Sequence, residues 1–355
     1  EYPVMFMDSK MVFITGATGL LGSHLLGYLA GVCGKKVCAL RRHKSRLEEV
    51  KEIFRLYTTD ETCWEAVRWV EGDVLEPETL EDAVAASGCV YHCAAVVSFA
   101  GADKEALSDI NVQGTQNVIR LCRKRGIRLC YVSSIAALGD TRFDGDIIDE
   151  KTPMIEGTPR SLYSGSKIAA EKIVWQAIAE GLNAVIVNPS IILGPGHWDR
   201  SSSRLYIAAS KGIPFYTQGI CGYVDVRDVC VAMVRLAEDR ELRGERFALN
   251  GGNYSYKELF TAIARHTGHH PPFICMPPWL TGIAWRVLAV AGKLTGRQPA
   301  FTRETARSSQ HKSCYSAVKL QKYYPDFTFR SLDETIRNIH AVYQQKQAEL
   351  SNPSR

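Results

Sequence analysis

The sequence has no long apolar run and little excess of either charge. No stretch approaches the roughly 18 consecutive apolar residues that cross a membrane, and residues 1–10 lack the basic start and long apolar core of a secretion signal. The formal net charge is +5, and the 43 basic residues are interspersed with 38 acidic ones. These absences predict a soluble chain without a nucleic-acid-binding stripe.

The cysteines show no sign of a disulfide framework or a metal site. Their number is eleven, which is odd, and none forms a C-x-x-C pair. Cys38, Cys89, Cys93 and Cys130 lie in apolar, strand-like runs, where a thiol behaves as a small hydrophobe. We therefore expect free thiols and a cytoplasmic protein. His92 lies in one of these runs without a second ligand at metal-binding spacing, which predicts a hydrogen-bonded core histidine and no metal.

The first apolar run ends in a glycine-rich turn. Residues 11–14 are apolar on both faces, as a buried parallel strand requires. Gly16, Gly19 and Gly22 follow, and leucines then recur at helical spacing. Such glycines let the backbone approach a pyrophosphate, which lies on the free N–H groups and the positive dipole end of the helix. The pattern predicts a dinucleotide site, although glycine turns also occur for packing alone.

Strands and helices then alternate along the chain. This alternation predicts an α/β fold, a doubly wound and mostly parallel Rossmann sheet with a smaller mixed C-terminal lobe that binds substrate. The expected strands cover residues 36–40, 67–70, 89–95, 128–139, 184–193 and 247–249, and the expected helices cover 47–56, 103–125, 163–180 and 223–236. We assign 9–196 to the Rossmann domain, with 216–250 returning to it, and assign 197–215 and 253–330 to the lobe.

The second strand lacks the acidic residue that usually ends it in dinucleotide folds. An acidic side chain there binds the ribose hydroxyls of adenosine, whereas the guanidinium groups of Arg41 and Arg42 suit a 2′-phosphate. The sequence therefore favours NADP over NAD, with a solvated basic start to the next helix as the alternative. Asp73, after the third strand, can accept from the adenine amino group or cap a helix. Ala94 and Ala95 would let the cofactor lie close to the backbone.

A serine, a tyrosine and a lysine are expected to meet at one edge of the sheet. Ser134 ends a strand, and Tyr163 and Lys167 begin the next helix on one face, one turn apart. An adjacent ammonium favours the phenolate and should lower the pKa of Tyr163. We expect Tyr163 to give a proton to a carbonyl oxygen as hydride arrives, Lys167 to bind the nicotinamide ribose, and Ser134 to bind the substrate oxygen.

Two features leave alternatives open. Asn111 should either hold a buried water or brace the neighbouring strand. The helix expected over 278–296 has apolar side chains on one face, which favours a core contact or pocket wall over a helix lying on a membrane surface. These side chains are Trp279, Ile283, Val287 and Leu288, with Trp285 near their edge.

Over nearly the whole chain, the sequence resembles the extended short-chain dehydrogenase/reductase superfamily, which is also described as the NAD-dependent epimerase/dehydratase family. The resemblance is carried by a set of motifs: TGATGLLG, GDV, HCAA, NVQGTQNV, VSS, YSGSK and NPSIILGPG. The paired arginines, YVDVRDV and KLQKYYPDFTF are similar to its dihydroflavonol 4-reductase-like branch. The resemblance implies Ser134, rather than Ser133, with Tyr163 and Lys167 as catalytic residues. It also implies a homodimer through the helices that carry Asn111 and Tyr163.

The motifs and the resemblance together predict one set of cofactor-binding residues. These residues are Gly16, Thr18, Gly19, Leu20, Leu21, Gly22, Arg41, Arg42, Asp73, Val74, Ala94, Ala95, Tyr163, Lys167, Pro189 and Ser190.

The favoured function is an NADP(H)-dependent oxidoreductase that interconverts a ketone or aldehyde with an alcohol, the partner being a small molecule. A nucleotide-sugar epimerase would use the same residues with tightly bound NAD, against which Arg41 and Arg42 count. A non-catalytic NADP-binding protein would commonly lack the tyrosine or the lysine. Sugar-nucleotide dehydration is disfavoured, because Ile135 and Ala136 rather than an acidic pair follow Ser134.

Overall fold

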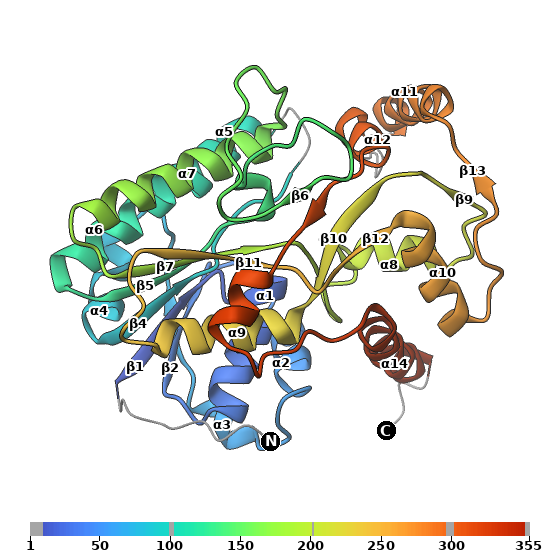
Figure 1. The fold of residues 1–355 in the computed structure, drawn as a ribbon. Helices are drawn as coiled ribbons and strands as arrows, with labels where there is room; N and C mark the ends of the chain where they lie inside the picture. Colours follow the sequence, from blue (N-terminus) through green and yellow to red (C-terminus); the bar gives the residue numbers. More distant parts are fainter. Residues whose placement is uncertain (1–9, 99–102, 201, 296–301, 352–355) are drawn as a thin grey trace.

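Figure 1 shows the computed structural model, which describes residues 10–98, 103–200, 202–295 and 302–351. Residues 9 and 99–102 of the expected Rossmann domain lie outside these ranges, as do residues 201 and 296–301 of the expected lobe. In the part of the chain that is described, no helix is both long and apolar enough to cross a membrane.

A seven-stranded parallel sheet forms the centre of the fold, in the order β11-β7-β5-β4-β1-β2-β3 (Figure 1). Its strands are β1 (Met11–Thr15), β2 (Val37–Arg41), β3 (Arg68–Glu71), β4 (Ser87–His92), β5 (Arg128–Val132), β7 (Ala184–Pro189) and β11 (Glu245–Leu249). The chain moves outward through β2 and β3 and then crosses to β4 on the other side of β1. The strand order therefore reverses between β1 and β4, which is where such folds bind dinucleotides. The predicted doubly wound sheet is confirmed.

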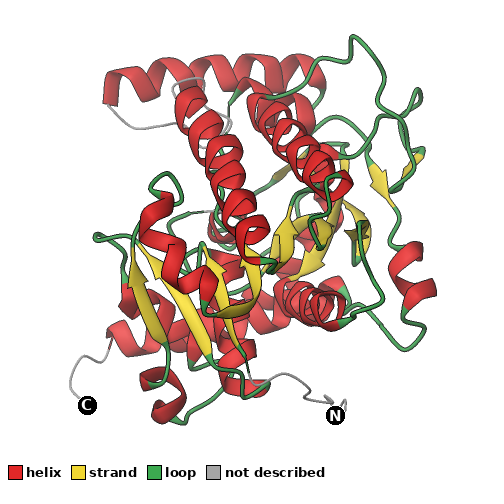
Figure 2. Cartoon of the chain, turned by 90° about the vertical axis from the view of Figure 1, so that its left-hand side faces the viewer, coloured by secondary structure: helices red, strands yellow, loops and turns green. Residues whose placement is uncertain are grey.

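Helices cover both faces of this sheet, as the side view also shows (Figure 2). One core joins α1, α2 and α9 to Val12 and Ile14 of β1, and a second core joins α4, α6 and α7 to Phe13. Successive residues of β1 thus point into opposite cores. The helices on the first face are α1 (Leu20–Gly27), its π-helical continuation (Tyr28–Val32), α2 (Leu47–Phe54), α3 (Glu61–Glu65) and α9 (Val226–Glu238). The second face carries α4 (Glu81–Ala85), the run α5 (Lys104–Ser108), a π-turn (Asp109–Gly114) and α6 (Thr115–Arg125), and α7 (Leu162–Ala179).

The smaller lobe contains short sheets and five helices among the described residues. Its three-stranded sheet has the order β12-β10-β8, and two strand pairs, β13 with β9 and β14 with β6, lie beside it. The strands are β6 (Ile147–Ile148), β8 (Ile191–Leu193), β9 (Phe215–Tyr216), β10 (Ile220–Asp225), β12 (Gly252–Ser255), β13 (Ile274–Cys275) and β14 (Cys314–Tyr315). The helices are α8 (Ser203–Ala209), α10 (Tyr256–Thr267), α11 (Pro278–Thr295), α12 (Arg303–Ser308) and α14 (Leu332–Ser351), while α13 (Val318–Tyr323) packs near β11.

The structure corrects three predicted elements. The run 184–193 is two strands, because the backbone N–H of Ser190 donates to Leu249 (3.0 Å) and the chain then leaves the central sheet for the sheet of β10. The start of the predicted helix 223–236 is strand up to Asp225, whose carboxylate caps α9 by accepting from the Arg227 N–H. The strand predicted over 128–139 ends at Val132, so Ser133 and Ser134 directly follow the strand, and residues 135–137 form a 3-10 turn.

The predicted core packing of the α11 side chains is wrong. Trp279, Ile283, Val287 and Leu288 are 66%, 50%, 61% and 44% exposed. The helix packs against α12 and lies at the margin of the lobe in Figure 1, so nothing in the described part of the chain covers this face. Hydrophobic periodicity predicts that a helix has an apolar face, but the face is buried only if another element reaches it.

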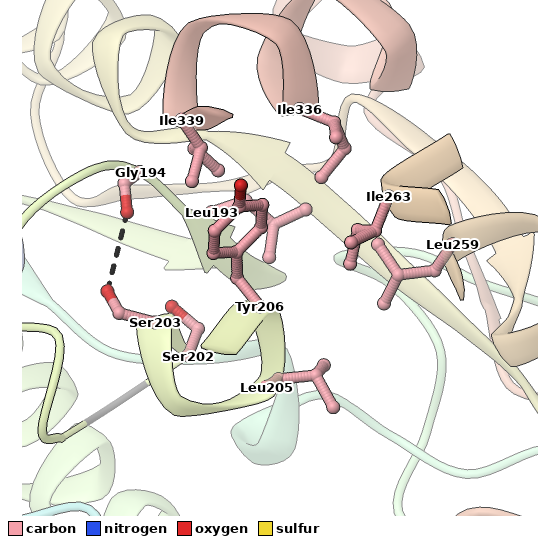
Figure 3. A pocket seen from close by; sticks show the side chains of 10 residues that line it. All are labelled: Leu193, Gly194, Ser202, Ser203, Leu205, Tyr206, Leu259, Ile263, Ile336 and Ile339. Carbon is pink, nitrogen blue, oxygen red and sulfur yellow. Dashed lines mark hydrogen bonds between the residues drawn. The ribbon is translucent and has the colours of Figure 1, made fainter. Parts of the chain in front are cut away.

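The lobe core encloses a small cavity of about 10 Å³ between β8, α8, α10 and α14 (Figure 3). Its walls are mostly leucine and isoleucine side chains, together with Tyr206. On the side of Gly194, the Ser203 hydroxyl donates to the Gly194 carbonyl at 3.4 Å. This volume is close to the minimum for a single water, so the cavity is a packing defect rather than a substrate site.

All eleven cysteines are free thiols, as the sequence predicts. Burial raises the pKa of Cys38 to about 11 and the pKa of Cys93 to about 12. Thiols of this kind are inert packing groups, because the thiolate is the reactive form.

Candidate active site

The glycine-rich turn lies where β1 meets α1, and its three glycines differ in what they do. Gly16 has φ +69°, and a Cβ there would lie 2.5 Å from the backbone nitrogen of Ala94. A Cβ on Gly22 would lie 2.1 Å from the Gly16 carbonyl oxygen. Both glycines are therefore required by the packing of the protein itself.

Gly19 has no such internal reason to be glycine. It is exposed, and a Cβ there would meet only the Gly16 oxygen, at an ordinary contact distance of 3.4 Å. Gly19 is also the N-cap of α1 and offers no side-chain cap to its first N–H groups. An open approach to uncapped N–H groups and a positive helix dipole fits a pyrophosphate. Thr18, Leu20 and Leu21 form the rest of this turn, with both leucines buried.

The two arginines after β2 are not equivalent. Arg41 is paired with Glu71 at the end of β3, with 3.1 Å between Nη2 and Oε2, and His43 contacts the same carboxylate. The exposed side chain of Arg42 has no partner among the described residues, while its backbone N–H donates to Ser45. Glu71, which the sequence analysis missed, therefore offsets one of the two charges. Arg42 is the better placed of the two for a 2′-phosphate.

The other predicted cofactor residues line the same edge of the sheet. Ala94 follows β4 beside Gly16, and Ala95 is exposed next to it. The Asp73 carboxylate accepts from the Leu75 N–H at 3.0 Å, so it already caps a turn. Val74 is a core residue with 4% exposure.

Pro189 and Ser190 lie at the end of β7, beside the last residue of β11. The Ser190 hydroxyl is not free, because it donates to the Leu249 carbonyl at 3.2 Å. The Ser190 hydroxyl could therefore contact a nicotinamide only as an acceptor.

The structure brings Ser134, Tyr163 and Lys167 together. Ser134 caps a short 3-10 turn (Ile135–Ala137), with its Oγ accepting from the Ala136 N–H at 3.1 Å, and its side chain is hydrogen-bonded to Tyr163. The Ser164 hydroxyl donates to the Ala136 carbonyl at 2.7 Å and ties the start of α7 to this turn. Lys167, 3% exposed, donates from Nζ to the Val132 carbonyl at 3.0 Å. The three side chains thus lie at the carboxyl end of β5.

The electrostatics of this group differ from the expectation. Burial raises the pKa of Tyr163 above its ordinary value, and the hydrogen bond with Ser134 opposes that rise only in part. The predicted lowering of the pKa of Tyr163 is therefore wrong for this structure, because desolvation of the phenol dominates. Burial also lowers the pKa of Lys167 to about 8, against the attraction of the Glu171 carboxylate.

Glu171 is a buried hub that the sequence analysis missed. Glu171 is 3% exposed. Its carboxylate accepts four hydrogen bonds: from the Ser133 hydroxyl, from Asn188 Nδ2 at 2.7 Å, from Trp175 Nε1 at 3.1 Å and from Arg246 Nη1 at 3.0 Å. The Ser133 hydroxyl is therefore committed to a hydrogen bond with Glu171, whereas the Ser134 hydroxyl is not. Asn188 also donates to the Ser134 carbonyl at 3.0 Å. The network joins α7, β7 and β11 directly beneath the candidate catalytic residues.

The spacing of α7 contained a signal for this hub. Tyr163, Lys167 and Glu171 follow one another at four-residue intervals and therefore lie on one face of the helix. A carboxylate continuing that face beneath a lysine was a testable candidate for a charge partner.

Asn111 braces the chain after β4, which was one of its two predicted roles. Its Oδ1 accepts from the Val96 N–H at 2.8 Å, and its Nδ2 donates to the Val96 carbonyl at 3.0 Å and to the Ser166 hydroxyl at 2.9 Å. It lies in the π-turn and is buried, 1% exposed, although it is polar. Asn111 therefore fixes the loop after β4 against α7.

His92 is a hydrogen-bonded core histidine, as predicted. Its Nδ1 lies 2.6 Å from the hydroxyl of Thr15, and its Nε2 lies 3.0 Å from the hydroxyl of Thr115. Burial, assisted by the charge of Lys167, lowers the pKa of His92 to about 3. It therefore remains neutral at physiological pH.

These features define a class of protein: a dinucleotide-dependent enzyme of the short-chain dehydrogenase type, with the glycine turn at the switch point of the sheet. The chain belongs to the NAD dependent epimerase/dehydratase family, whose model matches residues 12–249. Its relatives and structural neighbours include proteins named as reductases, dehydrogenases and epimerases, and the chain is an NAD(P)-dependent enzyme of this extended superfamily.

Three similar proteins illustrate the relationship. The chain is 31% identical to a "Putative dihydroflavonol 4-reductase" of Synechocystis sp., over 86% of this chain and 87% of the relative. It is 31% identical to "Sterol demethylase protein B" of Methylococcus capsulatus, over 76% of this chain and 79% of the relative. The crystal structure of gox2253 superposes with a TM-score of 0.76 at 28% identity, covering 95% of this chain and 98% of that one.

Proposed function

We propose that this enzyme is an NADP(H)-dependent oxidoreductase that interconverts a ketone or aldehyde with an alcohol. The observation that carries the proposal is the pairing of Tyr163 with Ser134, one helical turn from the Lys167 ammonium, at the sheet edge that also holds the Gly19 turn. The proton donor, Tyr163, and the dinucleotide-binding turn at Gly19 would then lie at the same edge of the sheet.

The raised pKa of Tyr163 keeps its phenol protonated at neutral pH, so it can donate a proton to a carbonyl oxygen. A bound nicotinamide supplies hydride to the carbonyl carbon in this direction and accepts it in the reverse direction. Ser134 holds the substrate oxygen beside the phenol, and the positive charge of Lys167 stabilises the phenolate left after proton transfer. In the reverse direction, the phenolate removes the proton of the alcohol.

Nucleotide content and a substrate screen test this proposal. We expect the purified protein to bind NADPH reversibly and more tightly than NADH, and to reduce members of a panel of ketones and aldehydes. Tightly retained NAD, with turnover of nucleotide sugars and none of the panel, would instead identify an epimerase.

Replacing Arg42 with alanine should weaken NADPH binding about tenfold or more, because a charge-assisted contact to phosphate contributes about 1.5–3 kcal/mol. The affinity for NADH should stay nearly unchanged. Titration calorimetry with both nucleotides measures the difference. Arg46→Ala is the matched control, since Arg46 already pairs with Glu49 and Asp199. Equal weakening of both nucleotides by Arg42→Ala would remove the 2′-phosphate assignment.

The reductive kcat/KM should fall as the pH rises through about 8, the value to which burial lowers the pKa of Lys167. Below this pH the ammonium is charged and can stabilise the phenolate, and above it the charge is lost. A pH profile of kcat/KM reports the free enzyme. Lys167→Arg keeps the charge over the whole range and should flatten the fall. A profile that stays flat to high pH in the unaltered protein would contradict this role.

We also propose that the protein is a homodimer through the helices of Asn111 and Tyr163, and that it is cytoplasmic. The eleven free thiols support a reducing compartment. Analytical ultracentrifugation and fractionation of the source cells test the two statements separately.

A further inference from the structure

The exposed face of α11 is an apolar ridge. Trp279, Ile283 and Val287 follow one another at four-residue intervals and are 66%, 50% and 61% exposed. A helix that lies against solvent ordinarily presents polar residues there. Large exposed apolar side chains in a row mark an interaction surface.

The opposite face of α11 is firmly attached to the lobe, so the ridge has a fixed orientation. Thr281, between Trp279 and Ile283 in the chain, is 3% exposed. Gln310 donates to the Thr281 hydroxyl at 3.3 Å and to the Met276 carbonyl at 2.8 Å, and α12 packs alongside. The lobe therefore holds the ridge outward.

A second group of exposed apolar residues precedes α11 directly. Phe215 and Ile274 are paired across β9 and β13 and are 45% and 38% exposed, and Phe273 beside them is 71% exposed. The Met276 N–H donates to the Tyr216 carbonyl at 2.8 Å and links this strand pair to the start of the helix. Figure 1 places both strands and the helix along one margin of the lobe.

The same part of the chain carries the positive charge of the protein. Residues 265–312 contain seven lysines and arginines but a single acidic residue, Glu304, whereas the remaining sequence is almost balanced. Arg286, Arg303 and Arg307 of this segment are exposed. The partner of the ridge should therefore be both apolar and negatively charged.

We propose that α11 docks on the surface of an anionic lipid bilayer and lies in the plane of the headgroups. An amphipathic helix with tryptophan and aliphatic residues on one face and basic residues around it is suited to this position. Anionic headgroups would pair with the arginines. A second copy of this chain would bring two positively charged segments together, so the charge disfavours self-association here. This docking is independent of the proposed catalytic function.

Vesicle flotation with the full chain tests the docking. We expect binding to vesicles of phosphatidylcholine mixed with phosphatidylglycerol, about tenfold or more stronger than binding to phosphatidylcholine alone, and weakened by salt. Trp279→Ser combined with Ile283→Ser should lower the partition coefficient about tenfold or more. Arg303→Gln combined with Arg307→Gln should remove much of the preference for anionic lipid.

Leu350→Ser is the matched control, because Leu350 is also 66% exposed but lies on α14. It should bind vesicles like the unaltered protein, and all variants should keep the thermal unfolding transition of the unaltered protein as a measure of folding. Absence of vesicle binding by the unaltered protein overturns the proposal, and so does equal binding by the Trp279/Ile283 variant. A change from dimer to monomer in that variant, without lipid binding, would assign the ridge to a protein interface instead.

Discussion

Replacing Tyr163 with phenylalanine should lower kcat by about 10²–10⁴-fold, the usual contribution of a positioned proton donor. The substitution removes only the hydroxyl that is hydrogen-bonded to Ser134 and keeps the buried ring. The KM for the carbonyl substrate and the Kd for NADPH should change little. Steady-state kinetics with NADPH, together with binding titrations, measure the three quantities separately.

Two controls distinguish chemistry from folding. Tyr57→Phe removes a phenol that is bonded to His24 at 2.8 Å, away from the candidate site, and should leave kcat unchanged. Ser134→Ala should lower kcat, whereas Ser133→Ala should mainly lower stability, because Ser133 donates to the buried Glu171. If Tyr163→Phe retains full turnover, Tyr163 is not the proton donor and the non-catalytic interpretation gains support.

The alternation of strands and helices and the location of the glycine turn could be predicted because both are marked in the local sequence. Apolar runs ending in small residues mark buried parallel strands, and a cluster of glycines directly after such a run marks the turn into the next helix. The proximity of Ser134, Tyr163 and Lys167 could be predicted because the carboxyl ends of parallel strands lie at one edge of the sheet.

The remaining features depend on pairing between distant segments. Glu71 faces Arg41 because β3 lies in register with β2, and Arg246 reaches Glu171 from the far edge of the sheet. The hydrophobic periodicity of the sequence predicts neither of these two pairings. The same limit explains why α11 was expected to be covered: the pattern defines an apolar face, but not which element packs on it.

Replacing Glu171 with alanine should lower the free energy of unfolding by about 3–5 kcal/mol, the cost of removing one partner of a buried ion pair. Arg246, with a side chain 19% exposed, would keep its bond to the Glu150 carbonyl at 3.0 Å but lose its carboxylate. Ser133 would lose its acceptor, and Asn188 would lose one of its two. Denaturant titration measures the change. Glu180→Ala, which breaks an exposed pair with Arg123 at the end of the same helix, should cost less than about 1 kcal/mol.

Glu171→Gln separates the electrostatic role of this residue from its packing role. The amide keeps the shape of the side chain but removes the negative charge that raises the pKa of Lys167 against burial. The pKa of Lys167 should then fall below about 8, so the alkaline decrease of kcat/KM should move to lower pH. A purely structural residue would lower stability and leave this profile in place. If a folded Glu171→Gln variant keeps an unshifted profile, Glu171 only holds α7, β7 and β11 together. The expected shift would instead make Glu171 a positioning residue, which keeps Lys167 charged beside Tyr163.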